Sequence, residues 1–420
     1  MAGSLLMAGA RLRPRAFRLT MLAAALTLPG VAAAGATTAR STFPTPPSLV
    51  VERVVVVMRH GVRPPTKDPA MPAGTAAQPW PRWPVPPGWL TPHGARAVAL
   101  LGQADAQALR AQRLLPARGC PAAGTVRVVA DSDQRTIATA QGWTQALLPG
   151  CTTVIDHAPQ DVEDPRFNAL SHGLARLDPA AADAGIREAI GPDGLGALDA
   201  AMRPMVARLD AILCGSATRG CGVGDQPSAI APARPGQRPK LSGTLDRAST
   251  AAHILLLEYA DGKALADVGW GRATAADVTR LSTFHALEFA ILARPRAIAA
   301  PNFAGLAPIV RKGLAGPARV TMISGHDTNI ANLAGLIGAH WRIPGYAADD
   351  PAPGGALVIE QVRGHDGAAL VRVRYRAQSL EGTRRLSPAA PVSQPMALPG
   401  CALPGQPTLC PLDRFVALLG

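Results

Sequence analysis

The chain has 420 residues, a formal net charge of +13 and a hydrophobic content of 48%. This composition excludes a disordered polypeptide and allows two or three domains, or one large domain with an insertion. Only 4% of the residues are aromatic and the sequence has no dense run of lysine or arginine, so we expect no nucleic-acid partner. The positive balance fits an anionic substrate or an anionic surface, without choosing between them.

The first 34 residues have the composition of an export signal. A basic stretch containing Arg11, Arg13 and Arg15 precedes an apolar run over 19–28, and small residues over 32–34 offer a cleavage site. We therefore expect residues 1–34 to be a removed signal peptide and 35–48 to be a linker, with a retained anchor as the alternative. No later segment is apolar for long enough to predict stable membrane insertion. The predicted location is periplasmic or secreted.

Six cysteines follow the signal, an even number that suggests disulfides in an exported chain. Six cysteines allow fifteen pairings. Short separations favour Cys214–Cys221 and Cys401–Cys410, which leaves Cys120–Cys151. The sequence contains no Cys-x-x-Cys pair, so we expect no structural zinc site.

The valine-rich run over 54–58 predicts a buried strand that stops at Arg59-His60-Gly61. In open α/β sheets, ligands bind beyond the carboxyl ends of the strands. Arg63 follows His60 closely, and two guanidiniums that flank an imidazole suit a phosphate group. The alternative is a strand end capped by solvated charges.

A strand–helix–strand–helix order follows. The proline-rich loop over 64–91 predicts either a wall of the ligand site or a rigid surface loop. Thr91 is a plausible N-cap for a helix that we expect to reach about residue 115. The strand predicted over 126–130 leads to Arg135 and a second helix. Alternation of this kind is typical of an α/β fold.

Helical patterns dominate 176–315, which predicts an inserted cap domain. We expect helices over 186–209 (broken at Gly191-Pro192), 241–259 and 275–292, the last capped by Thr274. Strand patterns then return over 318–324, and a hairpin is predicted from 356–362 and 369–375. The α/β domain would thus comprise 49–175 and 316–420.

The strand over 318–324 ends at Gly325-His326-Asp327-Thr328-Asn329. Three predicted strands therefore end in ionisable groups: Arg59 and His60, Arg135, and His326 with Asp327. If these strands are parallel neighbours, the groups meet at one edge of the sheet.

The segment over 59–66 resembles the RHGxRxP signature of the histidine acid phosphatases, and the segment over 325–329 resembles their downstream His-Asp motif. Arg135 matches the third phosphate-binding arginine of that family. The resemblance covers most of the mature chain and is closest to the bacterial phytase and glucose-1-phosphatase group. It implies an α/β fold with a mixed, mainly parallel central sheet flanked by helices, and an inserted smaller α-helical domain.

The resemblance also implies roles for the motif residues. His60 would attack phosphorus and form a phosphohistidine, and Asp327 would protonate the leaving group as general acid. The phosphoryl group would be held by Arg59, Arg63, Arg135 and His326. No cofactor is implied. Use of His60, His326 and Asp327 as metal ligands is disfavoured, because the arginines would repel a divalent cation.

The substrate is less defined by the sequence. Thr66 and Lys67 lie just beyond the phosphate loop and could meet further phosphates, and Thr328 favours a phytase-like enzyme. His253 stands where phytase-like relatives carry an acidic substrate contact, which argues against a preference for inositol phosphates. A glucose-1-phosphatase-like or broad acid phosphatase is therefore the alternative. A phosphoglycerate mutase-like transferase and a non-catalytic protein that binds phosphorylated ligands are the competing functions. The expected partner is a small phosphate monoester, and the expected state is a monomer.

Overall fold

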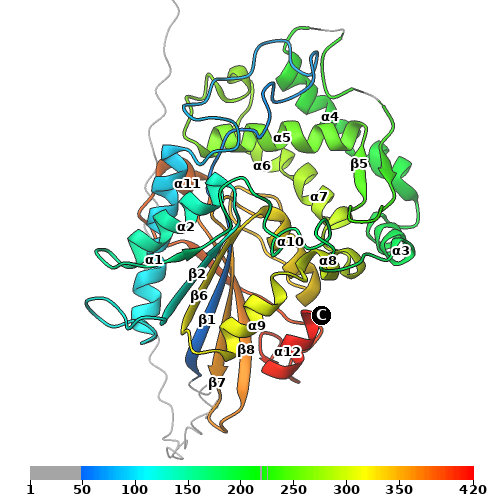
Figure 1. Ribbon diagram of the computed structural model, residues 1–420. Helices are drawn as coiled ribbons and strands as arrows, with labels where there is room; N and C mark the ends of the chain where they lie inside the picture. The colour runs from blue at the N-terminus through cyan, green and yellow to red at the C-terminus, as the bar shows by residue number, and fades with distance from the viewer. Residues whose placement is uncertain (1–48, 218–219, 225) are drawn as a thin grey trace, which may run out of the picture. The chain divides into compact units, whose positions relative to one another are not determined.

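Strand β1 (Val50–Arg59) lies in the interior of an eight-stranded sheet (Figure 1). Its valines alternate between the two faces of the sheet: Val55 and Val57 belong to one hydrophobic core, whereas Val54 and Val56 belong to the other. Burial on both faces explains why this strand is a continuous apolar run. The computed structural model describes residues 49–217, 220–224 and 226–420. The predicted export signal (1–34) and linker (35–48) lie outside the described residues.

The strand order of the sheet is β10-β8-β7-β1-β6-β2-β3, with β9 paired to β8. Strands β1, β6, β2 and β3 run parallel, β7 is antiparallel to β1, and β8 is antiparallel to β7. Five of these eight strands thus share one direction, which confirms the predicted mixed, mainly parallel sheet. The strands are β1, β2 (Val126–Ala130), β3 (Ile155–Asp156), β6 (Val320–Gly325), β7 (Ala356–Arg363), β8 (Ala369–Ala377), β9 (Val392–Pro395) and β10 (Cys410–Pro411).

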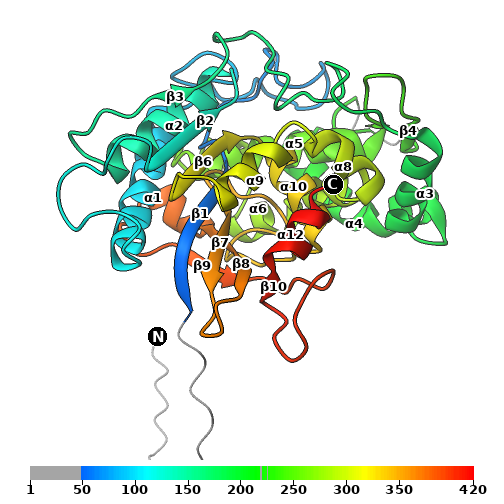
Figure 2. The ribbon, with the colours of Figure 1, turned by 60° about the horizontal axis from the view of Figure 1, so that its bottom comes forward.

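Helices cover both faces of this sheet. On one side lie α1 (Pro92–Ala111) and α2 (Gln134–Leu147), and on the other lie α9 (Ala307–Ala315), α10 (Asp327–Ile337) and α12 (Leu412–Leu418) (Figure 2). The first helix is capped as predicted, because the Thr91 hydroxyl accepts from the Gly94 N–H at 2.8 Å.

A group of helices from the middle of the chain lies beyond the carboxyl ends of β1, β6 and β2 (Figure 1). Its main elements are α3 (Pro179–Ile190), α4 (Gly194–Cys214), α5 (Thr244–Ala260), α6 (Ala275–Leu281), α7 (Thr283–Leu292) and α8 (Arg296–Phe303), with a small β4 (Ala229–Ala231) and β5 (Lys240–Ser242) hairpin. This arrangement agrees with an inserted helical part, while the predicted boundaries at 176 and 315 stay predictions. Helix α11 (Leu380–Arg385) lies against α5.

Three predicted helices differ from the structure. The one expected over 186–209 is observed as α3 and α4, which together extend from Pro179 to Cys214. The helix expected over 241–259 begins only at Thr244, because residues 240–242 pair as β5 with β4. The helix expected over 275–292 is divided at Ser282, whose hydroxyl donates to the Thr279 carbonyl at 2.8 Å and accepts from the Ala347 N–H. The bond from the Ser282 hydroxyl to the Thr279 carbonyl competes with the backbone hydrogen bonds of a continuous helix. The break predicted at Gly191 and the cap at Thr274 are confirmed.

All three predicted disulfides are present: Cys120–Cys151, Cys214–Cys221 and Cys401–Cys410. Disulfides of this number fit an exported protein. Within the described part of the chain, no helix combines the length and the apolar character needed to cross a membrane.

Candidate active site

The carboxyl ends of three neighbouring parallel strands form the floor of the candidate site. Arg59 of β1 is in register with Gly325 of β6, and Ser324 of β6 is in register with Ala130 of β2. The segments that begin at His60, Asp131 and His326 therefore leave the sheet side by side. This confirms that the three strand ends meet at one edge.

His60 is buried with one of its ring nitrogens fixed. Its Nδ1 lies 2.8 Å from the Gly61 carbonyl oxygen, and because a carbonyl only accepts, Nδ1 carries the hydrogen and Nε2 keeps its lone pair. Gly61 leaves no room for a side chain, since a Cβ there would lie 2.8 Å from Leu90 and Val98. Burial, reinforced by Arg135, Arg63 and Arg59, holds the pKa of His60 well below its usual range. The imidazole is thus a neutral nucleophile in mildly acid solution.

Two further guanidiniums line the cavity beside His60. Arg63 donates to the Pro64 carbonyl at 2.9 Å, and Arg135 lies 2.6 Å from Asp133. Burial, followed by the charge of Arg135, lowers the pKa of Arg63 to about 9. In the described structure, the Nε atoms of both arginines are buried without a hydrogen-bond partner. Two crowded cations with unused donors are suited to a bound anion.

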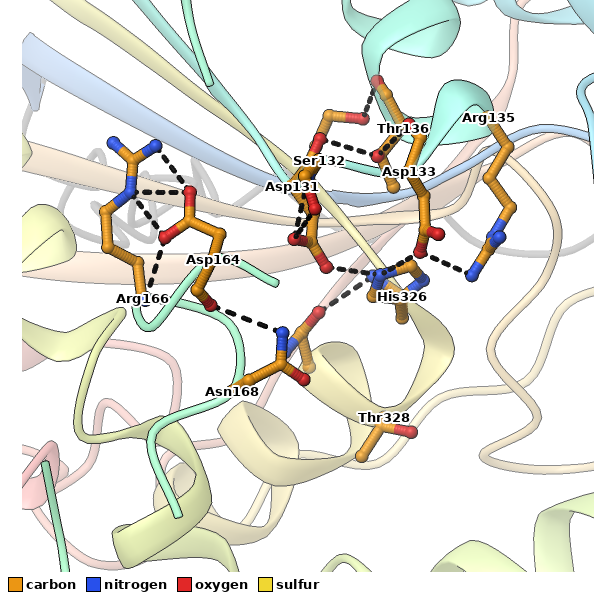
Figure 3. A network of polar contacts seen from close by, with 12 residues as sticks. Asp131, Ser132, Asp133, Arg135, Thr136, Asp164, Arg166, Asn168, His326 and Thr328 are labelled. Atoms are coloured by element: carbon orange, nitrogen blue, oxygen red, sulfur yellow. Dashed lines mark hydrogen bonds and ion pairs between the residues drawn. The ribbon is translucent and has the colours of Figure 1, made fainter. Parts of the chain in front are cut away.

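His326 is held by two carboxylates. Its Nε2 lies 2.7 Å from Asp131 Oδ2 and 3.4 Å from Asp133 Oδ2, as Figure 3 shows together with Arg135 beside Asp133. His326 is also the N-cap residue of α10, and its N–H donates to Asn329 Oδ1 at 2.8 Å. Its ring centre lies 5.6 Å from that of His60. The imidazole therefore donates through Nε2 and lies next to the nucleophile.

Arg59 links the strand end to Asp327. Its guanidinium lies 2.9 Å from Asp327 Oδ2, donates to His253 Nε2 at 2.7 Å and donates to the Pro351 carbonyl. Burial favours the neutral form of Asp327, but Arg59, with His285 and His253, outweighs it and holds the pKa of this carboxyl well below its usual range. Beside Arg59, Asp327 is therefore ionised.

Two residues next to Asp327 were not predicted from the sequence. His285 of α7 and Asp350, in the segment before β7, form a buried hydrogen bond of 2.7 Å. The other ring nitrogen of His285 lies 3.8 Å from Asp327 Oδ2. Neither residue belongs to a motif, and they are 65 positions apart. The one available signal was a pair of acidic residues before Pro351 at the start of the hairpin.

The predicted site residues share one cavity of about 1380 Å³. Arg59 is the exception, because it is 1% exposed and lies behind the cavity wall. His253, predicted as a substrate contact, lines the cavity but accepts from Arg59. The loop after β1 supplies part of the wall, as one of its two interpretations predicted. The predicted residues on the wall are His60, Arg63, Thr66, Lys67, Arg135, His253, His326, Asp327 and Thr328.

Two groups of side chains have the composition of metal ligands: His253, His285 and Asp327, and separately Asp131, Asp133 and His326. In each group an arginine already holds donor atoms. Arg59 contacts Asp327 and His253, and Arg135 contacts Asp133. Some of these donors thus already serve a guanidinium, and metal-independent chemistry stays a prediction.

The comparisons with known proteins agree with this geometry. The sequence pattern of the histidine phosphatase superfamily (branch 2) matches residues 50–187. The chain is 32% identical to phytase AppA of Escherichia coli over 404 residues, which cover 89% of this chain and 92% of that protein. It is 28% identical to a glucose-1-phosphatase of Salmonella typhimurium over 389 residues, 88% of this chain and 92% of that protein.

Solved structures show the same relationship. The Hafnia alvei phytase in complex with tartrate has a TM-score of 0.81 at 30% identity, over 89% of this chain and 97% of that one. The Klebsiella phytase has a TM-score of 0.78 at 30% identity, over 89% and 95%. With its strand-end cluster and these similarities, the chain belongs to branch 2 of the histidine phosphatase superfamily and is a phosphoric monoester hydrolase of the histidine acid phosphatase type.

Proposed function

We propose that this enzyme hydrolyses inositol polyphosphates at acidic pH through a phosphohistidine on His60. The observation that carries the proposal is the free Nε2 lone pair of His60, which the Nδ1 contact to Gly61 imposes, in a cavity that is also lined by Arg63, Arg135 and His326. A neutral nucleophile surrounded by cations is what attack on a phosphate dianion requires.

In the first step, His60 Nε2 attacks phosphorus, so that a P–N bond forms while the ester P–O bond breaks. Arg63, Arg135 and His326 line the cavity and offset the charge on the phosphoryl oxygens, and Arg59 adds its positive charge from behind the wall. Asp327 gives its proton to the leaving alkoxide oxygen. Because a bound phosphate adds negative charge beside Asp327, substrate binding raises the pKa of this carboxyl and favours the protonated form.

In the second step, water attacks the same phosphorus and the P–N bond breaks. Asp327, now ionised, accepts the proton that the water loses, and His60 recovers its lone pair. The sum of the two steps is an ester and water converted into an alcohol and phosphate, with each group returned to its starting state.

The size and charge of the cavity support a substrate with several phosphates. Its volume of about 1380 Å³ exceeds the ~300–1,000 Å³ of ordinary small-molecule pockets. Away from His60 its wall carries Lys67, Arg238, Lys240 and Arg247. These cations could bind phosphates that are not being cleaved, as the sequence led us to expect for Lys67, Thr66 and Thr328.

Glucose 1-phosphate is the second candidate substrate. It is favoured by the similarity to glucose-1-phosphatases and by His253, which places an imidazole on the α5 side of the cavity. A small sugar phosphate would leave the cationic wall unused, so the first candidate accounts for more of the cavity.

A substrate panel at acidic pH tests the proposal. We expect inositol hexakisphosphate to have a higher kcat/KM than glucose 1-phosphate or p-nitrophenyl phosphate, with no effect of EDTA. A higher value for glucose 1-phosphate would transfer the assignment to the second candidate. Phosphate exchange between sugars without release of free phosphate would indicate a transferase instead, and binding without turnover would indicate a binding protein.

We also infer that the mature enzyme is a monomer that acts in the periplasm or outside the cell. The three disulfides and the composition of residues 1–34 support export. Mass determination of the exported protein would test both the cleavage near residue 34 and the oligomeric state.

A further inference from the structure

A buried histidine and a buried carboxylate lie directly behind Asp327. His285 is 6% exposed and Asp350 is 1% exposed. The distance between His285 Nδ1 and Asp350 Oδ1 is 2.7 Å. A buried carboxylate is costly unless it is paired, and an ionised carboxylate only accepts, so His285 Nδ1 carries a hydrogen. The opposite nitrogen, Nε2, is then directed at Asp327.

The ring of His285 is held on its faces as well as at its edge. The centre of the His253 ring lies 4.0 Å from the centre of the His285 ring. The Phe289 ring is in T-shaped contact with His285, with a distance of 4.6 Å between the ring centres. These two rings and the contact with Asp350 restrict rotation of the imidazole. Its position is therefore defined as firmly as that of the motif residues.

The short segment that contains Asp350 also holds Arg59. The Asp350 side chain binds His285, the carbonyl of Pro351 accepts from Arg59, and the N–H of Ala352 donates to the Tyr375 hydroxyl at 2.8 Å. His285 and Arg59 both reach Asp327 Oδ2, at 3.8 Å and 2.9 Å. Asp350 and Pro351, in a segment that Ala352 anchors to Tyr375, thus position the two groups that face the general acid.

We propose that His285, oriented by Asp350, is a positioning residue that supplies the proton that Asp327 delivers to the leaving alcohol. The inference rests on the proposed roles of His60 and Asp327. A shift of under 1 Å would bring the 3.8 Å separation into hydrogen-bond range, and such contacts commonly shorten when substrate binds.

The proton is accounted for at each step. In the first step His285 acts as an imidazolium with a hydrogen on both ring nitrogens. It loses the Nε2 proton to Asp327 Oδ2 and keeps the Nδ1 hydrogen that it donates to Asp350, and Asp327 passes a proton to the alkoxide as the ester bond breaks. In the second step Asp327 takes a proton from the attacking water and returns one to His285 Nε2. Transfer of the phosphoryl group to and from His60 proceeds as in the two steps given above, so the enzyme ends each cycle as it began.

The charged groups that face His285 come from several elements. They are Asp327 of α10, Asp350 of the segment before β7, His253 of α5, Glu288 of α7 itself and, through Asp327, Arg59 of β1. Arg59 favours the ionised form of Asp327, and its effect appears as a lowered pKa. His285 lowers the same pKa, so the proton that reaches the alkoxide belongs to the Asp327–His285 pair rather than to Asp327 alone.

Two esters with different leaving groups test the proposal in His285→Gln and Asp350→Asn. Glycerol 2-phosphate needs a proton on its leaving alkoxide, whereas p-nitrophenyl phosphate releases a stable phenolate. We expect kcat/KM for glycerol 2-phosphate to fall about tenfold or more in each variant, with p-nitrophenyl phosphate changed by no more than about twofold. The alkaline limb of the glycerol 2-phosphate pH profile should move to lower pH.

Asp349→Asn is the matched control, because its carboxylate pairs with the exposed His340 at 2.6 Å rather than with His285. An equal loss on both esters, or an alkaline limb that does not move, would overturn the proposal. If His285→Gln does not fold, Asp350→Asn, which keeps the size of the side chain, decides. Turnover of both esters by the unmodified enzyme tests the proposed function separately.

Discussion

The sheet edge and the helical wall contribute to the cavity in different ways. The sheet edge (Arg59, His60, Arg63, Arg135 and His326) is positioned by the register of three parallel strands. The helical wall of α5 and α7, with His253 and His285, is positioned by packing between helices and by the segment that holds Asp350. The first region is set by backbone hydrogen bonds between paired strands, and the second by side-chain contacts between helices and a loop.

This difference suggests a division of work. The sheet edge presents a nucleophile and cations, which any phosphate monoester requires. The helical wall controls the proton on Asp327 and the space available for the rest of the substrate. Changes at the edge should therefore affect every substrate alike, whereas changes at the wall should discriminate between substrates.

Arg135→Ala should cause the largest loss. Removal of one cation from the phosphoryl group should lower kcat/KM by about 10³-fold for alkyl and aryl phosphates alike. Arg127→Ala is the control. Arg127 of β2 pairs with Asp156 at a distance of 3.7 Å and does not line the cavity. A loss confined to one class of ester would contradict the division.

Asp327→Asn should separate the two kinds of ester. Without a general acid, kcat/KM for glycerol 2-phosphate should fall about 10²-fold, while p-nitrophenyl phosphate should lose less than about tenfold. Steady-state rates on both esters provide the measurement. Equal losses would show that Asp327 acts mainly by holding Arg59.

Lys240→Ala tests the cationic wall of the cavity. Loss of one exposed charge contact should raise KM for inositol hexakisphosphate about two- to fivefold and leave KM for p-nitrophenyl phosphate unchanged. Lys263→Ala is matched to it, because Lys263 donates to the Arg82 carbonyl at 2.7 Å and lies over Trp83. An unchanged KM for both substrates would remove Lys240 from the substrate site.

Glu258→Gln should alter stability rather than activity. Glu258 of α5 is fully buried, and burial raises its pKa from 4.5 to about 8. The unfolded chain releases this proton near pH 4.5, so its contribution to stability is present below that pH and is lost as the pH rises through about 8. Relative to the unmodified protein, the free energy of unfolding of the variant should be about 2–4 kcal/mol higher at pH 8.5 than at pH 4. Denaturant titrations at the two pH values check this, and a pH-independent effect would contradict it.

The sheet edge could be predicted from the sequence because its signals are local. The local sequence predicts both a strand and the reactive group that follows it. This holds for the valine run that ends at His60 and for the strand that ends at His326. The parallel order of these strands then brings the groups together.

The helical wall could not be predicted in the same way. His285 lies on an apolar helix where a histidine carries no signal, and its partner Asp350 is distant in sequence. The division at Ser282 depends on a bond to Ala347, and β5 depends on pairing with β4. Each of these features arises from tertiary contacts that periodicity does not report.

Trapping the covalent intermediate tests the central claim most directly. Enzyme mixed at pH 5 with ³²P-labelled substrate should be quenched in denaturing alkali, where a phosphohistidine survives, and the label located by mass spectrometry. We expect one labelled histidine, His60, modified at Nε2, with no label in His60→Ala and no turnover by that variant. A label on another residue, or an active His60→Ala enzyme, would contradict the proposed mechanism.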